Sequence, residues 1–179
     1  MREVTQAGAD DVVDAGRHEA DVYRGDNPRP LGGYLAVLGV YCAAVAVATV
    51  LAVVTGRRLP AGWRVQDLIT VTLGTHKLSR TLTKDAVTSR LRAPFTQYAE
   101  TGGPAELKEE VRQESQLRHS LGELLTCPFC LDMWVATAFV IGLIFAPRFT
   151  RLIAGSFTAL AGADFLQLAN ATAQQSAEG

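Results

Sequence analysis

The sequence contains few cysteines and no excess of charge of either sign. Only three Cys occur among 179 residues, at positions 42, 127 and 130, and the formal net charge is −1. Three cysteines at this spacing do not form the disulfide framework of a small secreted domain. A net charge near zero, with basic residues scattered along the chain, predicts that nucleic acid is not a partner.

The N-terminal residues also do not match the pattern of a cleavable signal peptide. Residues 1–30 are polar and rich in Asp and Glu, and the apolar block that follows them exceeds the length of a cleavable segment. The first apolar block is therefore expected to remain as a membrane anchor. The polar segment, with few large apolar residues and a turn at Asn27-Pro28, is predicted to be a disordered N-terminal tail.

Apolar residues, by contrast, are abundant, at 48% of the chain, and they are concentrated in blocks. Leu31 to Val54 carries no charge and, at about 1.5 Å per residue, is long enough to cross a hydrocarbon core of about 30 Å. Residues 127–146 form another apolar block, whose sole charge is Asp132 near its start, and residues 152–173 form a third with Asp164 at its centre. These blocks predict an all-α fold, a small helical bundle in a membrane.

A further segment, Trp63 to Leu82, has a short uncharged centre but repeats its apolar residues near the helical period. Its flanking basic side chains can extend to the membrane surface, so we predict about four transmembrane helices, or three if this segment does not span. Ionisable residues at membrane depth are functional candidates, which singles out Asp67, His76 and Asp164. A helix-end position explains His76 equally, and a hydrogen bond to a threonine of a neighbouring helix is an alternative role for Asp164.

Residues 83–126 are hydrophilic and are predicted to form a helical cytoplasmic loop. The pattern indicates a short helix that stops before Pro94 and a second helical element after Gly102-Gly103-Pro104. With four spans, the N-terminal tail and this loop hold more Lys and Arg than the opposite side, so both termini are predicted to be cytoplasmic. The chain is then a multi-pass plasma-membrane protein with a short C-terminal tail at residues 174–179.

The side chains with the most reactive chemistry lie in the sequence Cys127-Pro128-Phe129-Cys130. Proline is favoured at the first helical position, so Cys127 is predicted to cap a helix and Cys130 to lie in its first turn. The positive end of the helix dipole favours a thiolate there.

Three interpretations of this pair remain open. C-P-F-C resembles the C-P-[YF]-C of glutaredoxins, in which the first Cys attacks and the second resolves, although no βαβ pattern surrounds it here. A zinc or iron site would need further ligands, either His119 and Glu123 or the cysteines of a second chain. Alternatively, the two cysteines are small, weakly polar residues at a helix entrance.

No cofactor is firmly predicted from these patterns, and zinc is the metal considered. The first hypothesis for function is a non-enzymatic scaffold or partner-binding membrane protein. Its partners are the lipid bilayer and either a second copy of the chain or another membrane protein. Thiol–disulfide exchange and metal binding are the alternatives.

Three sequence blocks together resemble a known family. They are residues 67–82, the R-x-P-F-T block at 92–96, and the E-L-x-T-C-x-x-C block at 123–130 followed by Trp134. The combination is similar to a bacterial membrane-protein family called domain of unknown function 1360, over about Leu31 to Leu168. This resemblance implies an integral membrane protein with a paired-cysteine motif, and it implies no activity, ligand or catalytic residue.

Overall fold

A computed structural model describes residues 2–26, 29–60 and 62–178 of the chain. The structure is mostly helical, which confirms the predicted class, with one small β-hairpin in addition. In chain order, the elements are α1 (Arg2–Arg24), α2 (Leu31–Val54), α3 (Val65–Lys84), the 3-10 turn η1 (Ala86–Thr88), α4 (Ser89–Arg92), β1 (Thr96–Thr101), β2 (Leu107–Val111), α5 (Gln116–Thr126), α6 (Pro128–Phe145) and α7 (Pro147–Glu178).

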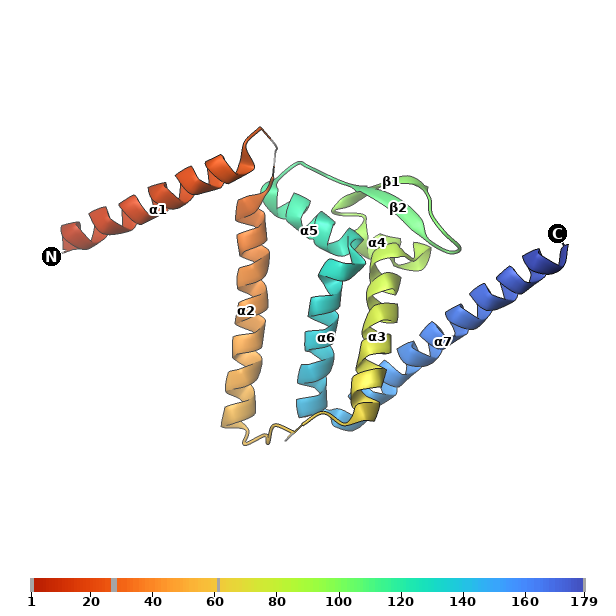
Figure 1. Ribbon diagram of the computed structural model, residues 1–179. Coiled ribbons are helices and arrows are strands. Elements are labelled where there is room, and N and C mark those ends of the chain that lie inside the picture. Colours follow the sequence, from red (N-terminus) through yellow and green to blue (C-terminus); the bar gives the residue numbers. More distant parts are fainter. Residues whose placement is uncertain (1, 27–28, 61, 179) are drawn as a thin grey trace.

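Helices α2, α3 and α6 stand side by side, and α5 and the β1–β2 hairpin lie across one end of them (Figure 1). Helix α7 begins at the opposite end and leans away from the bundle towards its own C-terminus. Helix α3 packs against both α6 and α7, whereas α2 contacts mainly α5. The buried apolar core is small and lies where α3, α6 and α7 meet; its buried members are Val71, Leu131, Val135, Phe139 and Ala154.

Three helical segments are long and apolar enough to cross a membrane: Leu31–Val54, Pro128–Phe145 and Pro147–Ala177. Most of their apolar side chains face outward, as lipid-facing helices require. Within the described ranges, α3 is not among these segments, because polar and charged residues interrupt it. By length and composition the structure therefore has three candidate spans, the number predicted for the case in which the second segment does not cross.

The two ends of the chain differ from the predicted tails. Arg2–Arg24 form α1 instead of a disordered segment, and α7 continues through the predicted C-terminal tail as far as Glu178. A helix satisfies its backbone hydrogen bonds locally and needs no buried core, and ion pairs three residues apart, Arg17–Asp14 (3.0 Å) among them, support α1. Asn27 and Pro28, where a turn is predicted, lie outside the described residues.

The central segment is only partly helical, so the prediction of a helical loop is wrong over its middle. The short helix that stops before Pro94 is present as η1 and α4, but Leu107–Val111 is a strand paired antiparallel with Thr96–Thr101. In this register Tyr98 lies opposite Glu109, and a bulge follows between Tyr98 and Glu100. In the strand, Glu109 pairs with Arg92, which lies 17 residues earlier in the chain. This pairing favours the strand over the helix that the local apolar spacing suggested.

Gly74 allows α3 and α7 to approach closely. A Cβ atom at this position would lie 2.9 Å from the carbonyl oxygen of Ala154, which is only 1% exposed. At the same crossing, the Thr158 hydroxyl donates to the carbonyl oxygen of Thr70 at 2.8 Å. Small residues at such a contact let two backbones come together within a membrane.

Replacing Gly74 by leucine is therefore expected to push α3 and α7 apart and to lower the free energy of unfolding by about 1–3 kcal/mol, the usual range for overpacking. Thermal unfolding in detergent micelles, followed by circular dichroism, measures the loss. Gly155→Leu is the matched control, because a Cβ at Gly155 on α7 would meet nothing within 4 Å. Equal melting temperatures for the two variants would contradict the close contact.

Candidate functional site

Cys127 forms the corner between α5 and α6. Its backbone N–H donates to the carbonyl oxygen of Glu123 at 3.1 Å, which ends α5. Its Sγ accepts the backbone N–H of Cys130 at 3.3 Å and caps α6, with Pro128 in the first turn. The predicted helix cap is confirmed.

The same corner brings the two thiols together. Cys130 Sγ lies 2.6 Å from Cys127 Sγ, and both cysteines are free. Cys127 is half-buried and Cys130 is exposed, while Phe129 between them is 87% exposed. The Cys127 sulfur thus accepts one hydrogen bond from a backbone amide and one from the neighbouring thiol.

A polar cluster lies one helical turn before the cysteines, around Glu123. The Tyr34 hydroxyl of α2 donates to its carboxylate, and Arg29 Nη1 and His119 Nε2 each lie 3.4 Å from Glu123 Oε1. Residues from α2 and α5 are therefore joined at the end of the bundle that carries the cysteines.

His119, a candidate metal ligand, therefore faces Glu123. Within residues 2–26, 29–60 and 62–178, no three His, Cys, Asp or Glu side chains gather closely enough to hold a metal ion. A metal site at the cysteine pair would accordingly need ligands from a second chain.

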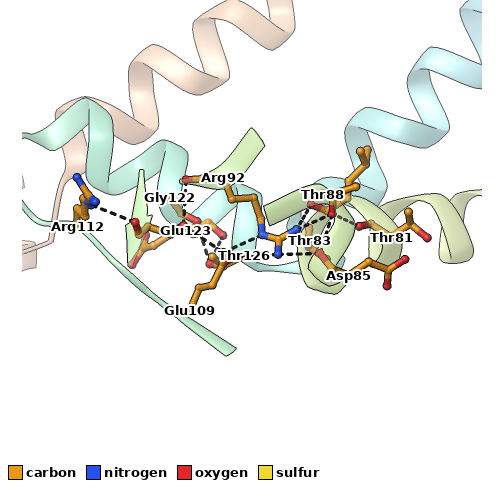
Figure 2. Close-up of polar contacts among 12 residues, drawn as sticks. Thr81, Thr83, Asp85, Thr88, Arg92, Glu109, Arg112, Gly122, Glu123 and Thr126 are labelled. Atoms are coloured by element: carbon orange, nitrogen blue, oxygen red, sulfur yellow. Dashed lines mark hydrogen bonds and ion pairs between the residues drawn. The ribbon is translucent and has the colours of Figure 1, made fainter. Parts of the chain in front are cut away.

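The R-x-P-F-T block forms a buried polar centre beneath the hairpin (Figure 2). Arg92 is completely buried, and its Nε and Nη2 donate to the two carboxylate oxygens of Glu109 at 2.7 and 3.1 Å. Its Nη1 donates to the carbonyl oxygen of Leu82 (2.8 Å) and the hydroxyl of Thr88 (2.7 Å), and Nη2 also donates to the carbonyl oxygen of Asp85 (3.0 Å). All the guanidinium donors are therefore used.

The other residues of the block connect this centre to α5. The Thr96 hydroxyl donates to the Arg92 carbonyl oxygen at 2.9 Å and lies 3.1 Å from Glu109 Oε2. A Cβ at Gly122 of α5 would lie 2.9 Å from the carbonyl oxygen of Phe95. The R-x-P-F-T block and the segment leading into the cysteines therefore pack directly against each other.

Sequence reasoning singled out neither Arg92 nor Glu109. A conspicuous signal existed for Arg92, within the R-x-P-F-T block, but an exposed charge is the ordinary expectation for arginine. Glu109 lies in a run of charged residues that looks solvated. The hairpin turns the Glu109 side chain inward, so that it is 6% exposed, and the local sequence does not indicate this.

Two of the ionisable candidates form ion pairs that join α3 to α7. Asp67 accepts from Arg151 Nε and Nη2 at 2.7 and 2.9 Å. Asp164 lies 2.7 Å from Lys77 Nζ, so its partner on the neighbouring helix is a lysine and not the threonine considered from the sequence. His76 is exposed and borders a cavity next to Asp164.

The face of α3 towards α6 is polar as well. Thr75, Ser79 and Thr83 recur at four-residue spacing and are 8%, 0% and 2% exposed. The Ser79 hydroxyl donates to the carboxylate of Asp132, which follows the cysteines on α6. Helix α3 therefore meets its neighbours through buried polar contacts as well as apolar ones.

These features define a helical protein with membrane-like helices, closed at one end by a hairpin and a dithiol corner. The chain belongs to the family described as "Protein of unknown function (DUF1360)", which matches residues 70–170. The match runs from α3 into α7, so it includes the Arg92 centre and both cysteines but not α2. No curated protein and no solved structure matches the chain.

Proposed function

We propose that this protein spans the plasma membrane through α2, α3, α6 and α7 and presents Cys127 and Cys130 as a reversible dithiol at the cytoplasmic membrane surface. The observation that supports the thiol chemistry is the 2.6 Å approach of the two sulfurs, with Cys127 accepting both hydrogen bonds. Helix capping and thiol pairing together distinguish the two cysteines, because Cys127 Sγ accepts hydrogen bonds from both the backbone N–H and the thiol of Cys130.

The placement of α3 in the membrane is supported by how its charges are held. Asp67 and Lys77 each have an oppositely charged partner on α7. Ionisable residues within membranes pair in this manner and face the protein interior. Helix α3 packs against α6, and in Figure 1 it covers the same length of the bundle as α6 and α2. Both termini, the hairpin and the cysteine corner would then face the cytoplasm, as the distribution of Lys and Arg predicts.

The proposed reaction is thiol–disulfide exchange with a partner protein that carries a disulfide. The Cys127 thiolate attacks one partner sulfur, the other partner sulfur leaves as a thiolate, and a mixed disulfide forms. The Cys130 thiol then loses its proton and attacks Cys127 Sγ, which releases the partner's remaining thiolate. Two electrons pass to the partner, whose disulfide is reduced, and a Cys127–Cys130 disulfide is formed in this chain.

Trapping the mixed disulfide tests this proposal. Cys130→Ser is expected to leave Cys127 joined to its partner, giving a higher-mass species on non-reducing gels of membranes, because the resolving thiol is gone. Cys127→Ser should trap nothing. Cys42→Ser is the control, since Cys42 lies on α2 and is exposed away from the pair.

The reactivity of the thiols gives a second measurement on the same membranes. Below pH 7, iodoacetamide should alkylate Cys127 faster than Cys130, because Cys127 is the attacking thiol of the proposed reaction and Cys130 is the resolving one. Equal rates for the two cysteines, together with no trapped species, would remove the redox function.

A partner-binding role without thiol chemistry is the second candidate function. It is favoured by Phe129, which is 87% exposed at the tip of the corner, where an aromatic side chain can insert into another protein. Under this alternative, replacing both Cys127 and Cys130 by serine leaves co-purification of the partner unchanged, whereas Phe129→Ser abolishes it.

A further inference from the structure

The end of the bundle opposite the hairpin is strongly basic. Helices α2 and α6 end there, and α3 and α7 begin there (Figure 1). Two helix ends and two helix beginnings largely offset each other's dipoles, so side chains set the charge of this end. Residues 55–67 and 146–151 contain five arginines against one aspartate, Asp67, a net charge of +4. We call this surface the arginine end; its arginines are Arg57, Arg58, Arg64, Arg148 and Arg151.

Contacts across the helix ends connect these arginines into one surface. Arg57, which follows α2, has its Cζ 6.0 Å from the centre of the Phe145 ring at the end of α6. Arg148 comes three residues after that ring, in the first turn of α7. One turn further along α7, Arg151 pairs with Asp67 near the beginning of α3. The basic side chains of the three segments are therefore neighbours in space.

Most of this positive charge has no carboxylate partner. In the part of the chain that the structure describes, Arg151 is the one member of the five that forms an ion pair with a carboxylate. All five arginines are exposed. Arg64 occupies the cap position of α3 and makes no side-chain cap, so N–H groups of that first turn are also free to donate. The arginine end therefore offers positive charge and hydrogen-bond donors to an anion from outside the chain.

Exposed apolar side chains lie on the membrane side of the arginines. Val50 and Val53 precede Arg57 on α2, which runs towards this end, and Leu152 follows Arg148 on α7, which runs away from it. All three apolar residues therefore lie deeper in the bundle than the arginine that they neighbour, and all three are exposed. A lipid molecule can place its headgroup among the arginines and its acyl chains along this apolar surface, whereas a soluble anion would use the arginines alone.

Aromatic side chains mark the level of the membrane boundary. Trp63 lies just before α3 and Phe149 in the first turn of α7, and they are 53% and 65% exposed. Tryptophan is enriched where hydrocarbon meets the headgroups. With the helices in the membrane as proposed above, the arginines lie at the level of the lipid phosphates.

We propose that the arginine end binds phospholipids with a net negative headgroup, in the membrane leaflet where this end lies. The arginines without carboxylate partners donate to phosphate oxygens, which the planar guanidinium group suits. A zwitterionic lipid fits less well, because it would bring a second cation among the arginines. The one carboxylate at this end that could accept that cation, Asp67, is already engaged by Arg151.

Quenching of Trp63 fluorescence by brominated lipid tests the proposal at the site itself. The chain has two tryptophans, so Trp134→Phe leaves Trp63 as the reporter. This variant is reconstituted in phosphatidylcholine bilayers that contain an equal small fraction of either phosphatidylglycerol or phosphatidylcholine, brominated near the headgroup end of the acyl chains. Phosphatidylglycerol should be enriched around Trp63 by at least about fivefold, the effect expected of one arginine beside an anionic lipid. Equal quenching by the two brominated lipids would overturn the proposal.

Two sets of substitutions, made in the Trp134→Phe protein, assign the enrichment to the arginines. The double change Arg57→Gln/Arg58→Gln and the single change Arg64→Gln should each bring the quenching by the two lipids closer to parity. Arg90→Gln, an exposed arginine on α4 at the hairpin end, is the control and should leave the enrichment unchanged. Enrichment that survives both sets in folded protein would overturn the assignment, and either set can be read if the other fails to fold.

A soluble ligand with the same headgroup chemistry is the alternative occupant. Glycerophosphoglycerol has the phosphatidylglycerol headgroup without acyl chains, so it cannot contact Val50, Val53 or Leu152. At a concentration equal to that of the brominated lipid it should leave the quenching unchanged. Loss of the enrichment under this condition would overturn a membrane lipid as the occupant.

This inference rests on the proposed membrane placement, but it depends neither on the thiol chemistry nor on which end of the bundle faces the cytoplasm. The two failures are distinguishable. Recovery of the chain in the soluble fraction of lysed cells would refute the membrane placement itself. Recovery in membranes, with equal quenching by the two brominated lipids, would refute only the lipid-binding role of the arginine end.

Discussion

Replacing Arg92 by alanine is expected to lower the free energy of unfolding by about 3–5 kcal/mol, the range for breaking a buried ion pair from one side. The substitution leaves the Glu109 carboxylate, which is 6% exposed, without its bidentate partner. It also removes a donor from two carbonyl oxygens at the end of α3, and that of Leu82 loses its partner, whereas that of Asp85 still accepts from Thr88. The hairpin should detach from the bundle, and limited proteolysis between Thr96 and Val111 should report that detachment.

A matched control for Arg92→Ala is available on the same hairpin. The ion pair between Lys108 and Glu100 spans 2.6 Å, but both side chains are well exposed, at 63% and 64%. Exposed pairs contribute little to stability, so Glu100→Gln should leave both the melting temperature and the proteolysis rate unchanged. Similar effects from Arg92→Ala and Glu100→Gln would show that the buried centre does not hold the hairpin in place.

Reversing one charge of the Asp67–Arg151 pair should also be strongly destabilising, and reversing both should recover most of the loss. Asp67→Arg places two guanidinium groups at the contact between the beginnings of α3 and α7. In the double variant Asp67→Arg/Arg151→Asp the attraction is restored with its direction reversed. Because Arg151 is 42% exposed and partly screened by solvent, we expect a coupling energy of about 1–3 kcal/mol between the two positions.

Chemical unfolding of the four proteins in a double-mutant cycle measures this coupling. Arg148→Asp, one turn earlier on α7 and exposed, is the control and should show no coupling to position 67. Additive effects at positions 67 and 151 would mean that the ion pair contributes nothing to the contact. Of the two ion pairs described between α3 and α7, the Lys77–Asp164 pair would then be left to stabilise α3 in the membrane.

The structure also explains why two short blocks characterise this sequence. R-x-P-F-T places a buried arginine and a threonine hydroxyl around Glu109, and its Phe95 carbonyl approaches Gly122 on the helix that leads to Cys127. The blocks are far apart in the chain but form one connected unit at the end of the bundle. Changes in the Arg92 centre should therefore also alter the position of the cysteine corner.

The sequence by itself determined the features that depend on neighbouring residues. The uncharged block Leu31–Val54 is a helix over the predicted range, and the proline after Cys127 identifies the first turn of α6 and its cap. Both follow from local physical chemistry: hydropathy over about 20 residues, and a first turn that proline suits because its N–H needs no partner. The proximity of Cys127 and Cys130 follows from the same helix geometry.

The tertiary structure alone decided which charges are buried and which segment becomes a strand. Arg92 and Glu109, Lys77 and Asp164, and Asp67 and Arg151 are separated by 17 or more positions, and nothing local marks them as partners. Leu107–Val111 has apolar spacing that also suits a helix, and it becomes a strand because pairing with β1 places Glu109 against Arg92. Partner choice over such distances depends on the whole folded chain, because the cost of burying each charge is offset only when its partner is already in place.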